Sequence, residues 1–116
     1  MIIKGVIQNR VYYAIPFCGE RFSTLEMIKY IIDKGINLEY RTCHGWLPIH
    51  LICYYSNLDT FNYIVNKGVN CNACINEFDD IYVNYNLIDL INKRFTDESK
   101  KQQYLNVLQN KINIYL

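Results

Sequence analysis

Two groups of side chains in this sequence have types and a spacing that could support chemistry. In the first, GWLPIHLICYYS, His50 precedes Cys53 by three residues, which places both side chains on one face of a helix. A histidine base beside a cysteine nucleophile is an arrangement used in covalent catalysis. Such catalysis also needs a group that orients the histidine and donors for the developing oxyanion, and the sequence supplies no candidate for either. We therefore expect no catalytic residue and no enzyme activity.

The second group is the pair Cys71 and Cys74, whose C-x-x-C spacing could hold one side of a zinc ion. A structural zinc site needs four ligands, and only Cys43 with His44 could add to the pair. These two do not form a second C-x-x-C, so we expect no metal and no cofactor. The three cysteines leave one alternative function open, a metal- or redox-responsive thiol protein that uses Cys71, Cys74 and Cys43.

Charge and composition argue against several classes of partner. The net charge is +1, and the 12 basic and 11 acidic residues are mixed along the chain, unlike the basic stripe that binds nucleic acid or anionic membranes. The acidic pair Asp79 and Asp80 is expected to lie in solvent. No run approaches the roughly 18 apolar residues of a membrane span, and the five cysteines are an odd number.

From these features we expect an intracellular protein, located in the cytoplasm, that is a monomer or a weak homodimer. Ile, Asn, Tyr and Lys are abundant, which is typical of AT-rich coding. A large DNA virus would be one source of such a chain, and the location would then be the cytoplasm of the host.

The elements that must position these residues follow a repeat. The segment YIIDKGINLEY returns 33 residues later as YIVNKGVNCNA. Apolar side chains recur in both copies with helical spacing, at Leu25, Ile28, Ile31 and Ile32 and then at Leu58, Phe61, Ile64 and Val65. We expect Lys34 and Lys67 in the last turn of each helix, where the helix dipole favours cations. Gly35 and Gly68 should end both helices in the left-handed conformation.

A shorter helix should precede the second copy. Pro48 suits a first helical position, because its missing N–H would have no partner there. We expect one helix from about Pro48 to Tyr55, a turn, and an antiparallel helix from about Leu58 to Lys67. A final helix is expected from about Glu98 to Ile112, with Tyr104, Leu105 and Leu108 on its apolar face.

The segment GWLPIHLICYYSNLDTFNYIVNKGVNCNA resembles the ankyrin repeat. The residues that carry the resemblance are Gly45, Pro48, Ile49, His50, Leu58, Asp59, Gly68 and Asn72. It is strong over residues 42–74, good over Leu25 to Asn37 and weak elsewhere. It implies an all-α fold, an ankyrin-like α-solenoid of about three stacked helix-turn-helix units joined by loops or short hairpins.

In this scheme residues 1–116 form one ankyrin repeat domain. It divides into a degenerate N-terminal unit (1–41), a regular unit (42–74) and a degenerate C-terminal capping unit (75–116). The sequence departs from the family pattern at four places. Pro16 is awkwardly placed, Leu47 replaces a capping threonine, Phe78 replaces a loop glycine, and the helix that begins near Leu87 comes about six residues late.

The resemblance implies a non-enzymatic protein–protein interaction module that binds through its concave face and its loop tips. The positions that most often touch targets in the family correspond here to Cys43, His44, Trp46, Tyr54 and Tyr55, with Arg41 at the margin. Structural roles are implied for Pro48, Gly35, Gly45, Gly68 and His50. The histidine is expected to hydrogen-bond the backbone of adjoining loops.

Two alternatives concern these residues. Tyr54 and Tyr55 could instead cover the seam between helices while Trp46 packs against a neighbouring loop, and the only partner could be a second copy bound end to end. If Trp46 and Tyr54 bind a partner, alanine at both should cost at least about 2 kcal/mol of affinity and leave the melting temperature nearly unchanged. Loss of folding would favour the packing alternative.

Overall fold

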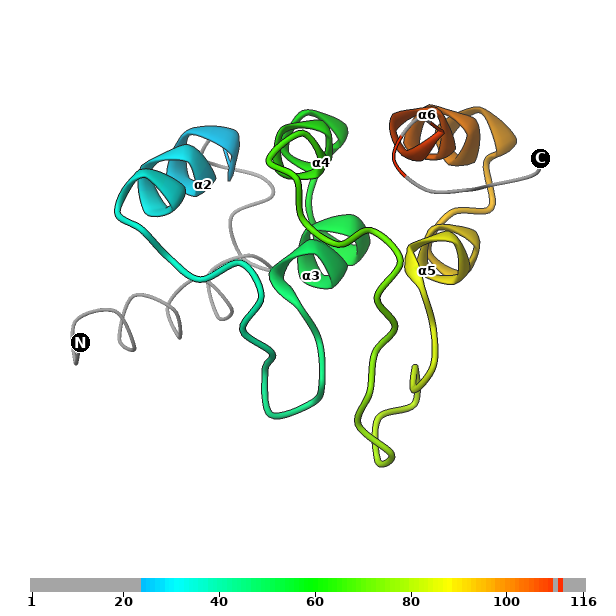
Figure 1. Cartoon of the computed structure of the whole chain (residues 1–116). Helices are drawn as coiled ribbons and strands as arrows, with labels where there is room; N and C mark the ends of the chain where they lie inside the picture. Colours follow the sequence, from blue (N-terminus) through cyan, green and yellow to red (C-terminus); the bar gives the residue numbers. More distant parts are fainter. Residues whose placement is uncertain (1–23, 110, 112–116) are drawn as a thin grey trace.

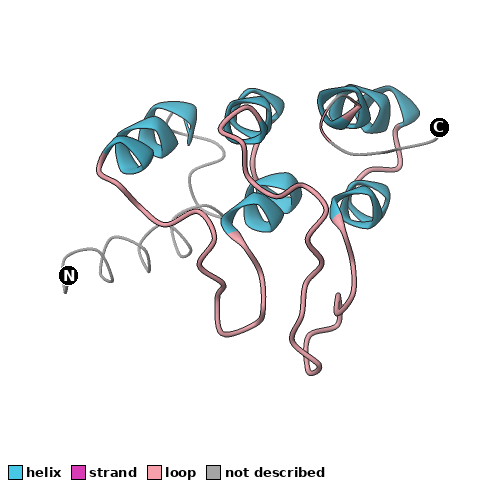
Figure 2. Ribbon diagram, in the orientation of Figure 1, coloured by secondary structure: helices cyan, strands magenta, loops and turns pink. Residues whose placement is uncertain are grey.

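The computed structural model describes residues 24–109 and residue 111, and this part of the chain contains helices, turns and loops but no strand (Figure 2). The helices are α2 (Thr24–Asp33), α3 (Pro48–Tyr55), α4 (Leu58–Val65), α5 (Leu87–Arg94) and α6 (Glu98–Leu108) (Figure 1). The predicted all-α fold is confirmed. Pro16 and the expected end of the last helix at Ile112 lie outside the described residues.

The helices pack as two layers of stacked hairpins. α3 packs against α4, and α5 packs against α6, which gives two antiparallel helix pairs. The pairs stack because α3 also contacts α5 and α4 also contacts α6, while α2 packs on the other side of α4. Figure 1 shows α2, α4 and α6 in one row with α3 and α5 beneath them. The solenoid prediction is confirmed; the division into residues 1–41, 42–74 and 75–116 remains a prediction.

The central helix α3 starts where the sequence predicts. Pro48 is its first residue, and Leu47 before it provides no side-chain cap. Every residue from Pro48 to Cys53 is buried, because α3 is covered by α4 on one side and α5 on another. The next helix begins with a side-chain cap, since the Oδ1 of Asn57 accepts hydrogen bonds from the N–H and hydroxyl of Thr60 at 2.9 and 2.8 Å.

One apolar core runs through the five helices of the described residues. It includes Ile28 of α2, Ile49 of α3, Phe61 of α4, Leu90 of α5 and Leu108 of α6, each no more than 2% exposed. The core is continuous because each helix turns its apolar stripe toward a neighbouring unit. No unit could bury its stripe alone, as the repeat pattern predicts.

The two copies of the repeated segment end in the same way. Gly35 and Gly68 follow α2 and α4 with φ of +84° and +82°, the left-handed conformation that the sequence predicts. The helices end at Asp33 and Val65, so the prediction that Lys34 and Lys67 lie in the last turn was wrong.

Each lysine instead lies over a tyrosine ring of the preceding turn. The Nζ of Lys34 is 5.1 Å from the ring centre of Tyr30, and the Nζ of Lys67 is 4.8 Å from that of Tyr63. A cation over an aromatic face is attracted by the ring quadrupole. The repeat therefore reproduces a side-chain pair as well as a helix and its glycine.

The last helix pair has caps of its own. The Oδ1 of Asn86 accepts a hydrogen bond from the N–H of Asp89, and the Oδ2 of Asp89 accepts one from the N–H of Asn86, which forms a capping box at the start of α5. Tyr104 of α6 stacks on Phe61 of α4 with ring centres 5.3 Å apart. This contact fixes the last pair against the central one.

Two long loops extend from the same side of the helix layers (Figure 1). We call residues 34–47 the first finger and residues 66–86 the second finger. The second finger carries the extra residues that delay α5, and it closes as a hairpin. The N–H of Ile75 donates to the carbonyl of Tyr85 at 3.0 Å, and the N–H of Asn84 donates to the carbonyl of Ile75 at 2.7 Å.

Candidate functional site

His50 is fully buried and uses both ring nitrogens. Its Nδ1 accepts a hydrogen bond from the N–H of Leu47 at 2.9 Å, so the ring proton is on Nε2, which donates to the carbonyl of Ala73 at 2.9 Å. Burial lowers the pKa of His50 to about 4; the hydrogen bond to Ala73 opposes this shift, and the positive charge of Arg41 adds to it. The ring joins the start of α3 to the second finger and has no free nitrogen to act as a base.

Cys53 lacks the properties of a nucleophile. Its side chain is 0% exposed, and burial raises the pKa of the thiol far above its usual range. The Sγ donates a weak hydrogen bond to the carbonyl of Leu87 at 3.8 Å. A buried, protonated thiol beside a histidine without a free nitrogen does not form a catalytic pair.

The remaining cysteines do not converge on a metal site. Cys71 is buried and its Sγ donates to the carbonyl of Val69 at 3.5 Å, whereas Cys43 and Cys74 are exposed. Burial raises the pKa of the Cys71 thiol. In the described part of the chain, no three His, Cys, Asp or Glu side chains are grouped so that they could hold a metal ion.

Hydrogen bonds join the two fingers. The Nη1 of Arg41 donates to the carbonyl of Gly45 at 2.7 Å and to that of Cys74 at 2.8 Å, and the N–H of Asn76 donates to the carbonyl of Gly45 at 3.3 Å. Gly45 has φ of +78°, and a Cβ added there would lie 2.5 Å from the backbone nitrogen of Glu77. Only glycine allows the fingers to approach so closely.

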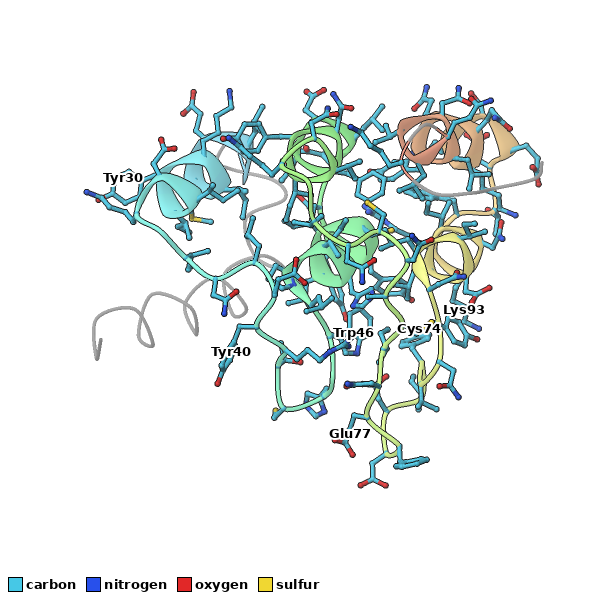
Figure 3. All side chains as sticks on the ribbon, in the orientation of Figure 1. Tyr30, Tyr40, Trp46, Cys74, Glu77 and Lys93 are labelled. Atoms are coloured by element: carbon cyan, nitrogen blue, oxygen red, sulfur yellow. The ribbon has the colours of Figure 1, made fainter. Side chains whose placement is uncertain are left out.

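Trp46 packs between the fingers and is 5% exposed (Figure 3). Its Nε1 donates to the Oδ2 of Asp80 at 3.0 Å, and its ring centre lies 5.7 Å from that of Tyr82 in the second finger. The packing alternative therefore describes its position. Of the acidic pair expected in solvent, Asp79 is exposed, whereas Asp80 is only partly exposed and its Oδ1 also accepts a hydrogen bond from the N–H of Tyr82 at 2.8 Å.

A groove of about 680 Å³ lies between the two fingers and α3. It is lined by Tyr40, Arg41, Thr42, Cys43, His44, Trp46, Leu51, Tyr55, Asp80, Ile81 and Tyr82. Five of the six predicted contact residues are among them. The sequence had placed these residues along one loop and one helix, without showing that they form a groove. The sixth, Tyr54, does not line the groove, and its hydroxyl lies 3.0 Å from that of Tyr82.

Two tyrosines near the groove, Tyr54 and Tyr55, have a raised pKa. The hydrogen bond to Tyr82 and burial raise the pKa of Tyr54 to about 12. Burial also raises the pKa of Tyr55, and the charges of Tyr82 and Asp80 act in the same direction. Tyr55, which is 43% exposed, therefore offers a ring and a neutral hydroxyl to a bound molecule.

The wall contributed by the second finger was missed by reasoning from the sequence. Asp80, Ile81 and Tyr82 fall in the extra residues before α5, where no position of the family pattern applies. The succession of acidic, apolar and aromatic types in DDIY was the one signal available there. Tyr40 and Leu51, at the other side of the groove, were also missed.

Comparison with known protein families identifies the central part of the chain. Residues 44–76 match the family model of the ankyrin repeat, a span that includes α3, α4 and the first residues of the hairpin in the second finger. The resemblance seen in the sequence is confirmed for residues 44–76, which match the ankyrin repeat. No curated protein and no solved structure gives a significant match. None of these comparisons supports a viral source.

The described helices include none that is both long and apolar enough to cross a membrane.

Proposed function

We propose that this chain is a non-enzymatic protein-interaction module that binds a protein partner in the groove between its fingers. Ankyrin repeats typically act as protein-binding units, and the stacked hairpins seen here present their loops on one side. The family alone does not define a site, so the proposal depends on the groove itself.

The observation that carries the proposal is that the groove is already built. Arg41 and Asn76 join the backbones of the two fingers, and the hydrogen bond from Trp46 to Asp80 joins their side chains. A partner would not have to order these loops, which removes part of the entropic cost of association.

The groove residues divide into two roles. Trp46 is buried, so it positions the wall and offers little surface to a partner. Tyr55 and His44 are exposed and line the groove, so they are the side chains that we expect to touch a partner. Tyrosine is one of the residue types that dominate binding energy at protein interfaces.

Affinity capture from the source cell tests this function. The wild type should recover a protein whose dissociation constant, measured by calorimetry, rises at least about tenfold in the double variant Tyr55→Ala, His44→Ala. Tyr30→Ala is the matched control, because Tyr30 is 63% exposed but lies on α2, away from the groove (Figure 3). Equal binding by the wild type and the groove variant would refute the proposed site.

The location that we propose is the cytoplasm. The four cysteines in the described part of the chain are all free thiols, which suits a reducing compartment.

A further inference from the structure

The tip of the second finger exposes two large apolar side chains. Phe78 is 90% exposed and Ile81 is 82% exposed, more than any other large apolar side chain in the described residues. Apolar surface of this kind is unfavourable in water and commonly marks a contact with another protein.

The backbone around this tip is fixed by hydrogen bonds. The N–H of Asp80 donates to the carbonyl of Glu77 at 3.1 Å, and the N–H of Val83 donates to the carbonyl of Asp80 at 3.1 Å. The Asp80 carboxylate is held in turn by Trp46. Phe78 is therefore presented outward on a turn whose shape is already set.

The two fingers carry opposite charges. The tip of the second finger has the carboxylates of Glu77 and Asp79 beside Phe78, and neither makes an ion pair, since the one salt bridge within the described residues joins Lys101 to Glu98. The first finger contains Lys34, Arg41 and His44 and one acidic residue, Glu39. An acidic, apolar tip thus stands beside a groove whose first-finger wall carries Arg41 and His44, while Asp80 lines its other wall.

We propose that a second copy of this chain binds at this groove, with the Phe78 tip of each copy entering the groove of the other. Phe78 would pack on the exposed ring of Tyr55, and Asp79 would lie near His44 and Arg41 of the opposite copy. Because the donor tip and the acceptor groove lie on adjacent fingers, a two-fold axis satisfies both contacts at once and closes the dimer.

This inference rests on the groove of the proposed function and adds regulation to it. A second copy would occupy the surface that a different partner needs. Dimer formation and partner binding should therefore compete, so the partner should bind more weakly at chain concentrations that favour the dimer.

Sedimentation velocity of the full chain over a wide concentration series is the first test. We expect a monomer–dimer equilibrium in the wild type and a dissociation constant at least about tenfold higher in Phe78→Ser. Tyr30→Ser is the control and should match the wild type. At chain concentrations low enough that the wild type is monomeric, melting temperatures should not differ between Phe78→Ser and the wild type, because Phe78 is 90% exposed. A wild type that stays monomeric, or a Phe78→Ser variant that dimerises equally well, would overturn the inference.

Charge exchange tests the pairing of the fingers. Asp79→Lys should weaken the dimer, and so should His44→Asp, whereas the chain with both changes should regain much of the affinity because opposite charges again face each other. Both side chains are exposed, so folding should be unaffected. Losses that simply add in the double variant would contradict this arrangement.

A thiol introduced at the tip tests proximity directly. In a Cys74→Ser background, Phe78→Cys should form a disulfide between copies with Cys43, which is exposed and lines the groove. Peptide mapping by mass spectrometry identifies the bonded cysteine, and a bond to any other cysteine would refute the geometry.

The two proposals can fail separately. If no dimer forms but the groove variant still loses the captured partner, the proposed function stands and the self-association is wrong. If the dimer forms through Phe78 and no partner depends on Tyr55 or His44, the groove serves self-association alone.

Discussion

At the start of α3, the His50 ring accepts a hydrogen bond from the N–H of Leu47 and donates one to the carbonyl of Ala73, 23 residues further along the chain. Leu47 stands where the family has a capping threonine, and no side-chain cap replaces it. The His50 ring therefore satisfies a backbone donor at this helix end and ties the helix to the second finger. Both partners are backbone groups, of which the N–H of Leu47 is buried and the carbonyl of Ala73 is partly buried.

Replacing His50 with alanine should destabilise the fold by about 2–4 kcal/mol, because the substitution leaves the buried N–H of Leu47 and the partly buried carbonyl of Ala73 unpaired and opens a cavity. Urea unfolding measures the change. His44→Ala is the matched control, since His44 is exposed on the first finger, and it should unfold like the wild type. A His50→Ala protein as stable as the wild type would show that these bonds contribute little.

Stability should also depend on the protonation of His50. Burial lowers the pKa of His50 from 6.5 to about 4 in the folded state, so between these values the unfolded chain binds a proton that the folded chain does not. The contribution is fully present above about pH 6.5 and is lost as the pH falls toward 4, by about 3 kcal/mol in total. Urea unfolding of the wild type and His50→Ala over this pH range isolates the effect. If the free energy of unfolding depended on pH equally in both proteins, protonation of His50 would not be the cause.

At the scale of the elements, the two fingers act as one unit because Gly45 lets their backbones meet. Its carbonyl accepts hydrogen bonds from Arg41 and Asn76, and no side chain separates it from Glu77. Trp46 and Asp80 add a second bridge, between side chains. The groove depends on this pairing, since its lining residues come from both fingers and α3.

Gly45→Ala should destabilise the protein more than Gly68→Ala, although both glycines have positive φ. Alanine at Gly68 meets no atom within 4 Å and should cost only the left-handed conformation, about 1 kcal/mol. Alanine at Gly45 also forces its Cβ against Glu77, which should add at least about 1 kcal/mol. Thermal unfolding of the two variants measures the difference, and equal losses would show that the fingers can separate freely.

The whole molecule depends on contact between units. The core passes from α2 through α4 to α6 without a break, and Phe61 of α4 stacks on Tyr104 of α6. A stack of this kind gains its stability from its interfaces, so loss at one interface should weaken every unit beside it.

Tyr104→Ala should therefore lower the free energy of unfolding of the entire fold by about 3 kcal/mol, and the unfolding midpoint should fall with it. Trp46, the one tryptophan in the chain, reports on the region between the fingers, while circular dichroism reports on all helices. Both signals should shift together. A fluorescence transition that stays at the wild-type midpoint while the dichroism transition moves would show that the units unfold independently.

Local features of the sequence determined the helices of the repeat. Helical spacing of apolar residues, Pro48 at a first turn and Gly35 and Gly68 beyond the ends act within a few residues, so their effect can be predicted without a tertiary structure. The same features carried the resemblance to the ankyrin repeat. The predicted helix ends were wrong by one or two residues, since Lys34 and Lys67 lie beyond the last turn.

The tertiary structure alone decided which residues of the site are buried in its wall and which are exposed in the groove. The sequence named Trp46 as a contact, but the structure buries it between the fingers, where its Nε1 donates to Asp80, 34 residues away in a loop that has no counterpart in the repeat pattern. Tyr82 of the same loop also lines the groove. Contacts between loops depend on how far each loop reaches and where it turns, and these are set by the packing of the helix pairs beneath them rather than by any local pattern.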